Sequence, residues 1–345
     1  MNNFKNAVKN FSQIALAALV VAGFIALPLT GCRHKKEQVA APTPTPTPVP
    51  VLGNVVFVQG GHLVEFNLSN SQITPLTSGK STEWFPSVSP KGDEVLYWSN
   101  ADATVYNLWK LNLINSQRTQ LTFNDTDGLH SNEKNLLLNT AAAWSNDGKS
   151  IIYAQDGDIW SIDADGYNPR TILAGHSALC PNFSPDGKSV LYLSNANDTV
   201  YNLYVFTQSD KTIKKITNYT DWSVGSPSYS TDGTKILFNL YRGDVTQLYT
   251  AKTDGTEPIN LTNNVRSLSP RFGQGDKKVY YSAYGAGEDS GLNIYVMSSN
   301  GTDVKELTTN GGASPSWATT IAPVAAAITA APTPLPVTVA KPAHK

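Results

Sequence analysis

A short motif recurs six times along the chain, and this repeat constrains the fold more than any other feature. It reads PSVSPKG at 86–92, AAWSNDG at 142–148, PNFSPDG at 181–187, PSYSTDG at 227–233, PRFGQGD at 270–276 and, cut short, PSWA at 315–318. Successive copies begin between 39 and 56 residues apart. A repeat of roughly 40–50 residues is typical of a β-propeller, in which each repeat forms one four-stranded blade.

Each copy continues into two β-forming runs separated by a variable loop, such as SVLYL at 189–193 and NLYVF at 202–206. Such runs are too short for helices and rich in aromatic and β-branched residues. Asp-Gly pairs favour tight turns, because Asp binds its own downstream backbone and Gly adopts a positive φ. We therefore expect the repeated Asp, Gly and aromatic residues to be structural, and Cys180 to be a small buried residue.

The two ends of the repeat region complement each other. Residues 54–77 match the last three strands of a unit, whereas residues 315–318 supply a first strand alone. Pairing them would complete one blade and remove the exposed edges of an open array. The sequence therefore predicts an all-β fold, a six-bladed β-propeller of four-stranded blades over 54–318. Its ring is closed by the N-terminal strands in 54–77 pairing with the C-terminal strand 315–318.

The N-terminal segment predicts export and lipidation. An apolar run ending at Leu29 follows two lysines and is shorter than the roughly 20 residues of a membrane span, so residues 1–31 are typical of a signal peptide. The sequence LTGC at 29–32 resembles the lipobox of bacterial lipoproteins. This resemblance implies acyl chains on Cys32 and anchoring in the membrane. We expect a periplasm-facing envelope protein, and Arg33 after the cysteine favours the outer membrane.

Two low-complexity segments flank the repeat region. Residues 32–53 contain AAPTPTPTPVP, and residues 319–345 are rich in Ala, Pro, Thr and Val. Proline fixes φ and removes a hydrogen-bond donor, so the first segment is expected to be an extended tether. The second is expected to be a disordered tail, which leaves open a role for it in contacting a partner.

Charge and cysteine content exclude some classes of function. Residues 1–31 hold two of the 26 basic residues and none of the 27 acidic ones, so the mature chain carries 24 basic and 27 acidic side chains. This balance does not favour a nucleic-acid partner, which requires a concentrated basic face. With Cys32 lipidated, Cys180 has no cysteine with which to form an intramolecular disulfide. We expect a monomer.

The repeat resembles that of the TolB-type, WD40-like propellers. The shared pattern is Pro-x-aromatic-Ser-Pro-Asp-Gly-Lys, a β-run, Ile or Leu with an aromatic residue, Asp-Gly, and a closing Leu-Thr such as that at 261–262. It covers nearly all of 54–318. The resemblance implies a six-bladed propeller in the cell envelope, and it carries less information about function, because propellers host unrelated activities.

Functional residues are expected where the repeat is broken, in the loops around the channel mouth of the propeller. Exposed aromatic side chains with a few charges are typical of a surface that recognises a protein or a glycan. The candidate ligand-binding residues are Trp84, Tyr106, His130, His176, Tyr201, Trp222, Arg242 and Arg266. We therefore expect a non-catalytic binding module whose partner is an envelope protein or glycan.

An enzyme remains the alternative hypothesis. Carboxylates in the channel could make the chain a polysaccharide-active hydrolase or lyase, for instance through the acid pair Glu288 and Asp289. The sequence has no Gly-x-Ser-x-Gly elbow and no phosphate-binding loop. Its five histidines show no ligand spacing, so we expect neither a metal nor another cofactor. A third possibility is a periplasmic sensor or assembly factor that uses the tail 319–345.

Overall fold

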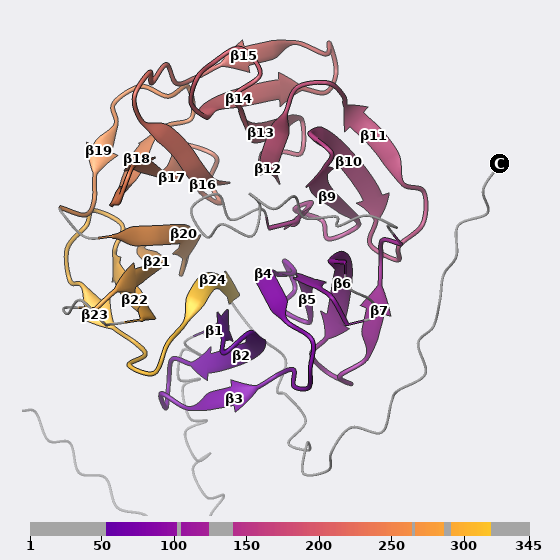
Figure 1. Ribbon diagram of the computed structural model, residues 1–345, viewed down its shortest axis with the longest axis vertical. Coiled ribbons are helices and arrows are strands. Elements are labelled where there is room, and N and C mark those ends of the chain that lie inside the picture. The colour runs from indigo at the N-terminus through magenta and orange to yellow at the C-terminus, as the bar shows by residue number, and fades with distance from the viewer. Residues whose placement is uncertain (1–52, 102–104, 124–140, 264–265, 286–290, 319–345) are drawn as a thin grey trace, which may run out of the picture. The chain divides into compact units, whose positions relative to one another are not determined.

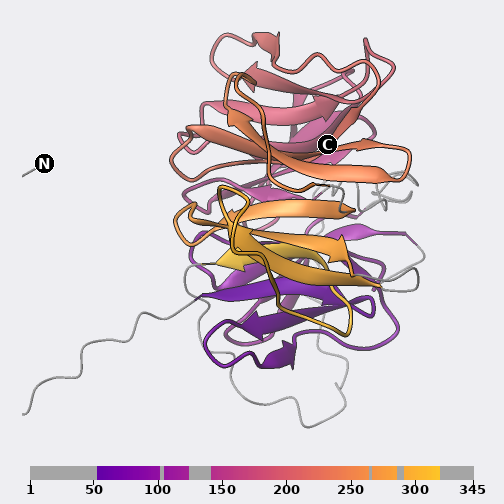
Figure 2. The ribbon, with the colours of Figure 1, turned by 90° about the vertical axis from the view of Figure 1, so that its left-hand side faces the viewer.

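The structure is a computed structural model that describes residues 53–101, 105–123, 141–263, 266–285 and 291–318. Within these ranges the fold is all β, with six four-stranded antiparallel sheets arranged radially around a central axis (Figure 1). The side view shows the sheets stacked as successive blades (Figure 2). This arrangement confirms the six-bladed β-propeller predicted from the repeat. No helix of the described residues is long and apolar enough to span a bilayer.

Each blade runs from an inner strand to an outer one, and the blades are numbered here along the chain. Blade 1 contains β4 (Glu83–Val88), β5 (Glu94–Ser99), β6 (Asn107–Asn112) and β7 (Arg118–Gln120). Blade 2 contains β8 (Ala143–Trp144), β9 (Ser150–Gln155), β10 (Asp158–Asp163) and β11 (Arg170–Leu173). Blade 3 contains β12 (Ala178–Phe183), β13 (Ser189–Ser194), β14 (Asn202–Thr207) and β15 (Ile213–Lys215).

The remaining blades follow the same order. Blade 4 contains β16 (Ser223–Tyr229), β17 (Lys235–Arg242), β18 (Val245–Lys252) and β19 (Ile259–Asn260). Blade 5 contains β20 (Ser267–Gly273), β21 (Lys278–Tyr284), β22 (Leu292–Ser298) and β23 (Lys305–Glu306). Blade 6 joins β24 (Ala313–Ala318) to β1 (Asn54–Gln59), β2 (His62–Asn67) and β3 (Ile73–Pro75).

Blade 6 closes the ring as the sequence predicted. β24 pairs antiparallel with β1, with Val55 opposite Trp317 and Val56 opposite Ser316. The closing strand begins at Ala313, two residues before the predicted start. The strands at the two ends of the repeat region therefore lie in one sheet, which leaves no open edge in the ring.

Hydrogen bonds explain why the repeated polar residues recur. In the turn after the inner strands of blades 2, 3 and 4, a carboxylate accepts from the serine two residues before it and from the backbone N–H two residues after it. These carboxylates belong to Asp147, Asp186 and Asp232. The glycine that follows each one has a φ of 69–70°. The structural role predicted for the Asp-Gly pairs is therefore confirmed.

The Leu-Thr ending of each unit also has a structural role. In every blade except blade 2, the threonine hydroxyl accepts a hydrogen bond of 2.8–2.9 Å from the backbone N–H of the third strand. The threonines are Thr77, Thr122, Thr217, Thr262 and Thr308. This contact fixes the chain where it leaves the outer strand and crosses to the next blade.

Apolar side chains fill the space between neighbouring blades. In five of the six copies the residue two positions after the start of the motif is aromatic and packs there, and in blade 1 it is Val88. The aromatic residues are Trp144, Phe183, Tyr229, Phe272 and Trp317. Five inner strands carry a bulge with a positive-φ residue directly before the motif proline, at Phe85, Cys180, Ser226, Ser269 and Ser314. Cys180 is 1% exposed, which confirms that it is a small buried residue.

The strand order gives the propeller two distinct faces. One face carries the loops between the second and third strands of each blade and the linkers between blades; we call it the mouth face. The other carries the hairpin turns between the first and second and between the third and fourth strands; we call it the turn face. The candidate ligand-binding residues that the structure describes belong to the mouth face.

Candidate functional site

The structure places seven of the eight candidate residues. His130 lies outside the described residues, as do Cys32 and the acid pair at 288–289. The seven described candidates do not form one contiguous site: they fall into separate groups on blade 1, at the junction of blades 3 and 4, and beside β20 of blade 5. His176 stands by itself before β12; it is half-buried, and its backbone carbonyl accepts from Ser194 Oγ at 2.5 Å.

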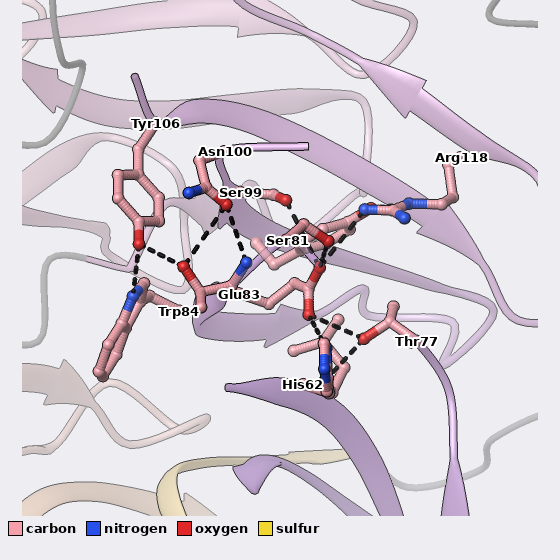
Figure 3. A network of polar contacts seen from close by, with 12 residues as sticks. His62, Thr77, Ser81, Glu83, Trp84, Ser99, Asn100, Tyr106 and Arg118 are labelled. Atoms are coloured by element: carbon pink, nitrogen blue, oxygen red, sulfur yellow. Dashed lines mark hydrogen bonds and ion pairs between the residues drawn. The ribbon is translucent and has the colours of Figure 1, made fainter. Parts of the chain in front are cut away.

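Trp84 and Tyr106 lie together on blade 1 (Figure 3). Trp84 Nε1 donates to Tyr106 Oη at 3.2 Å, and Thr82 Oγ1 also hydrogen-bonds to that phenol. Tyr106 is only 8% exposed and belongs to the core cluster between blades 1 and 2, so its side chain contributes mainly to packing. Trp84 is half-buried and presents the larger surface of the two.

A buried carboxylate beside this pair is held by a network of polar contacts on the mouth face. Glu83, the first residue of β4, is 0% exposed. Its Oε2 accepts from His62 Nδ1 at 2.9 Å and from Thr77 Oγ1 at 3.0 Å, and its Oε1 accepts from Ser81 Oγ at 2.7 Å (Figure 3). Because an ionised carboxylate only accepts hydrogen bonds, His62 is the donor in its contact.

The Glu83 network links blade 6 to blade 1. His62 and Thr77 belong to the chain of blade 6, whereas Glu83 starts the inner strand of blade 1. Arg118 on the outer strand of blade 1 approaches the same carboxylate at 3.5 Å and stacks over the rings of Tyr97 and Trp109. With five neighbouring donors, Ser99 Oγ at 3.5 Å among them, this carboxylate is held in place and is suited to fastening the closing blade.

Sequence reasoning missed this network. The available signal was an acidic residue at a position that is Ala178 in blade 3, Val224 in blade 4 and Ser267 in blade 5. A lone carboxylate at an otherwise apolar or small position of a repeat needs a compensating partner when it is buried. The partner could not be read from the sequence, because His62 comes from a different blade.

Half-buried aromatic rings form a patch at the junction of blades 3 and 4. We call Tyr201, Tyr219, Trp222, Tyr241 and Arg242 the aromatic patch. The four rings pack against one core cluster between the two blades. The Arg242 guanidinium carbon lies 4.8 Å from the Trp222 ring centroid, and the Arg242 side chain is exposed. Burial raises the pKa of Tyr241 to about 12, so its phenol is neutral at physiological pH.

A second stacked arginine stands beside the aromatic patch. The Arg266 guanidinium carbon lies 4.5 Å from the Tyr284 ring centroid, and its Nη2 lies 3.7 Å from Asp244 Oδ1. Both charged groups are exposed, so this ion pair contributes little to stability. Within the described ranges, Arg242 has no carboxylate at ion-pair distance, which leaves its charge available to a ligand.

Two grooves lie on the turn face, away from the predicted site. The first, of about 470 Å³, is lined by turns of blades 3 and 4 that include Asp186, Asp232 and Asp254. Hydrogen bonds from Ser230 and Thr234 lower the pKa of Asp232 to about 2. These carboxylates hold their own turns, and no group of three or more His, Cys, Asp or Glu side chains in the described part of the chain is placed to hold a metal.

Comparisons with known proteins agree with the architecture. The Tol-Pal system protein TolB of Francisella tularensis subsp. holarctica (strain OSU18) is 33% identical over 109 residues, which is 29% of this chain and 24% of that protein. TolB of Anaeromyxobacter sp. (strain K) is 30% identical over 103 residues, covering 30% of this chain and 23% of its own. This chain therefore spans about a quarter of the length of these curated relatives.

Solved structures of TolB share the fold. TolB from Acinetobacter baumannii superposes with a TM-score of 0.63 at 18% identity, over 78% of this chain and 67% of its own. Putative TolB from Agrobacterium tumefaciens gives a TM-score of 0.60 at 19% identity, over 76% and 90% of the two chains. The profile of the TolB beta propeller domain matches residues 154–327, half of the 345-residue chain. The chain therefore belongs to the TolB β-propeller domain family.

Proposed function

We propose that this protein is a non-catalytic, envelope-anchored binding module that grips a protein segment or a glycan on its mouth face. Its relatives are named as proteins of the Tol-Pal system, which supports a role in protein interaction in the cell envelope. Within that role, the propeller supplies a rigid ring, and the loops of the mouth face supply the contacts.

The observation that carries this proposal is the aromatic patch. It offers half-buried rings and an exposed arginine stacked on Trp222 without an acidic partner among the described residues. Aromatic residues and arginine are the side chains that dominate binding energy at protein interfaces. An arginine already stacked on a ring also loses less conformational freedom when it binds an acidic or polar group. Of the two ligand classes, an extended protein segment with acidic side chains fits this surface better.

The anchor is part of the same proposal. Lipidation at Cys32 after removal of 1–31 would attach the protein to the outer membrane, and the Pro/Thr-rich segment 32–53 would hold the propeller away from the bilayer. Labelling cells with a radioactive fatty acid tests this step. We expect label in the wild-type protein and none in Cys32→Ala, which should instead fractionate with the soluble periplasmic proteins.

The binding surface is tested by crosslinking in intact envelope followed by affinity capture. Arg242→Ala should reduce capture of the partner roughly tenfold, since an interface hot spot contributes on the order of 1–2 kcal/mol. Lys211→Ala is the matched control, because Lys211 also stacks on an aromatic ring, at 5.5 Å from Phe206, but on the turn face. Equal loss in both variants, or no loss in Arg242→Ala, would contradict the proposed surface.

An activity assay on the wild-type protein distinguishes the binding module from the enzyme alternative. Wild-type protein is incubated with a panel of envelope and plant polysaccharides, and new reducing ends or unsaturated sugars are measured. Turnover that disappears after substitution of one carboxylate would replace the binding module with a polysaccharide-active enzyme. Binding without turnover supports the module.

A further inference from the structure

The residue that follows the motif proline occupies an equivalent place on each inner strand, close to the axis of the ring. At this place side chains bridge neighbouring blades. Asn182 Nδ2 donates to the Pro227 carbonyl at 3.0 Å, and Ser316 Oγ accepts from Val88 N at 3.0 Å. The equivalent residue of blade 5 is Arg271, the one charged side chain in this set of small or polar residues.

Arg271 uses only part of its guanidinium. Its Nη1 donates to the Pro270 carbonyl at 2.9 Å and to the Ser226 carbonyl of blade 4 at 3.4 Å. In the structure as described, neither Nε nor Nη2 has a hydrogen-bond acceptor, and no carboxylate lies within 4 Å of the group. The edge formed by Nε and Nη2 is the edge on which a guanidinium binds two oxygens of a carboxylate or phosphate in parallel.

The charge of Arg271 is poorly compensated. Burial lowers the pKa of Arg271 to about 10, with the thiol of Cys180 as the nearby group that opposes this shift. The guanidinium therefore remains protonated at physiological pH, and the Arg271 side chain is partly buried. Two neutral carbonyls supply dipoles but no counter-charge, and a cation in this state gains strongly from an anion.

A second unsatisfied donor lies one blade away. Ser228 holds the equivalent place on β16, and its buried Oγ has no hydrogen-bond partner in the described structure. Its hydroxyl can donate to an oxygen bound near Arg271, as serine does in many phosphate and carboxylate sites. Two independent features, an unpaired guanidinium edge and an orphaned hydroxyl, thus occur on adjacent inner strands.

We infer that Arg271 and Ser228 form an axial binding site for an oxyanion, a carboxylate or phosphate group held by the free Nε and Nη2 edge of the guanidinium. This site is separate from the aromatic patch, and the proposal does not depend on the function proposed for the mouth face. The group could belong to a free anion or to an acidic side chain of a polypeptide that enters along the axis.

Isothermal titration calorimetry and thermal unfolding of the purified full-length chain test this site. The probes are sodium phosphate, sodium acetate, and the capped tripeptides Gly-Asp-Gly and Gly-Asn-Gly, with sodium chloride at equal ionic strength as the reference. We expect saturable binding of an oxyanion and a rise in the unfolding midpoint beyond that given by chloride. Binding of phosphate or acetate identifies a free-anion site, whereas binding of the Asp tripeptide alone identifies a polypeptide carboxylate.

Three variants make the result specific. Arg271→Gln should weaken the affinity for the anion at least tenfold. Arg271→Lys should bind with intermediate affinity, because lysine keeps the positive charge but cannot form two parallel hydrogen bonds to the anion. Arg170→Gln, which removes an exposed arginine 3.5 Å from Asp163, should bind like wild type. If the Arg271→Gln variant does not fold, Arg271→Lys still tests whether bidentate binding by the guanidinium or the positive charge alone holds the anion. Absence of saturable binding to all the probes, or wild-type affinity in Arg271→Lys, would overturn the proposal.

Discussion

Two tryptophans at equivalent positions of the repeat make a sharp test of how hydrogen bonding contributes to this ring. Trp144 in blade 2 is 8% exposed, and its Nε1 donates to the Ser87 carbonyl of blade 1 at 3.0 Å. Trp317 in blade 6 packs against Val55 and Phe57, but its buried Nε1 has no partner in the described structure. Phenylalanine occupies the same position in blades 3 and 5, so a Trp→Phe change is compatible with the local packing.

The two substitutions should lower stability by different amounts, because only Trp144 loses a hydrogen bond. Both remove a similar volume, so their packing losses largely cancel. Trp144→Phe also breaks one hydrogen bond and leaves a carbonyl unpaired, which costs about 1–2 kcal/mol more. Trp317→Phe removes a buried donor that is unpaired, and its desolvation penalty disappears with it. We expect the free energy of unfolding of Trp317→Phe to lie within about 1 kcal/mol of that of the wild type, and that of Trp144→Phe to be lower by about a further 1–2 kcal/mol.

Equilibrium urea unfolding, followed by far-ultraviolet circular dichroism, measures this difference. The unfolding midpoint of Trp144→Phe should fall clearly below that of Trp317→Phe, with similar slopes for both, because the surface exposed on unfolding is nearly unchanged. If Trp317→Phe is as destabilised as Trp144→Phe, the unpaired state of the Trp317 indole is wrong, and with it the description of the closing blade.

Three further outcomes follow from the structure. Deleting 313–345 removes β24 and should abolish cooperative unfolding, whereas deleting 319–345 should leave the unfolding midpoint unchanged. Gly255→Ala should lower the free energy of unfolding by about 3 kcal/mol, because the added Cβ would lie 1.9 Å from a backbone carbonyl oxygen of blade 3 and the residue has a φ of +85°. The control Gly243→Ala, at a φ of +57° and with open space around the added Cβ, should lower it by about 1 kcal/mol. Equal urea midpoints for the two variants would contradict this. The pKa of Asp232 is lowered to about 2, so its contribution to stability is complete above the ordinary pKa of 3.8 and is lost as the pH falls toward 2. Asp232→Asn should therefore flatten the pH dependence of the urea midpoint in this range. Parallel pH profiles for the variant and the wild type would refute this role of Asp232.

The ring was predictable because its determinants are local and repeated. Each Asp-Gly turn, Leu-Thr ending and alternating apolar strand is specified by residues within one unit, and six copies leave little choice of architecture. Closure could be predicted for the same reason, since residues 54–77 lack the strand that 313–318 supplies. The positive φ at Cys180 and its equivalents was not predicted, because nothing in their residue type distinguishes a bulge from regular strand.

The candidate site was less predictable because exposure depends on contacts between blades. Tyr106 follows a loop on the mouth face, yet its phenol is bonded by Thr82 and Trp84 and the side chain is buried. Trp222 and Arg242 are 20 residues apart in sequence and meet only because β16 and β17 pair. Loop position therefore identifies the face on which ligand contacts are expected but not the side chains that remain available there.

The departures of single blades from the repeat are the better guide to function in this fold. The place after the motif proline holds Ser87, Ala143, Asn182, Ser228 and Ser316 in five blades, and all of these are small or neutral. A repeat that serves only packing has no reason to place a guanidinium there, because even partial burial of a charge costs free energy that a serine would not. The repeat by itself does not point to Arg271, because residues within a repeated motif are expected to be structural. Aligning the copies shows a charged residue where the other described copies have a neutral one at two places, Glu83 and Arg271. The structure then separates them, since Glu83 has His62 and Arg118 beside it, whereas the hydrogen bonds of Arg271 to described residues go to two backbone carbonyls.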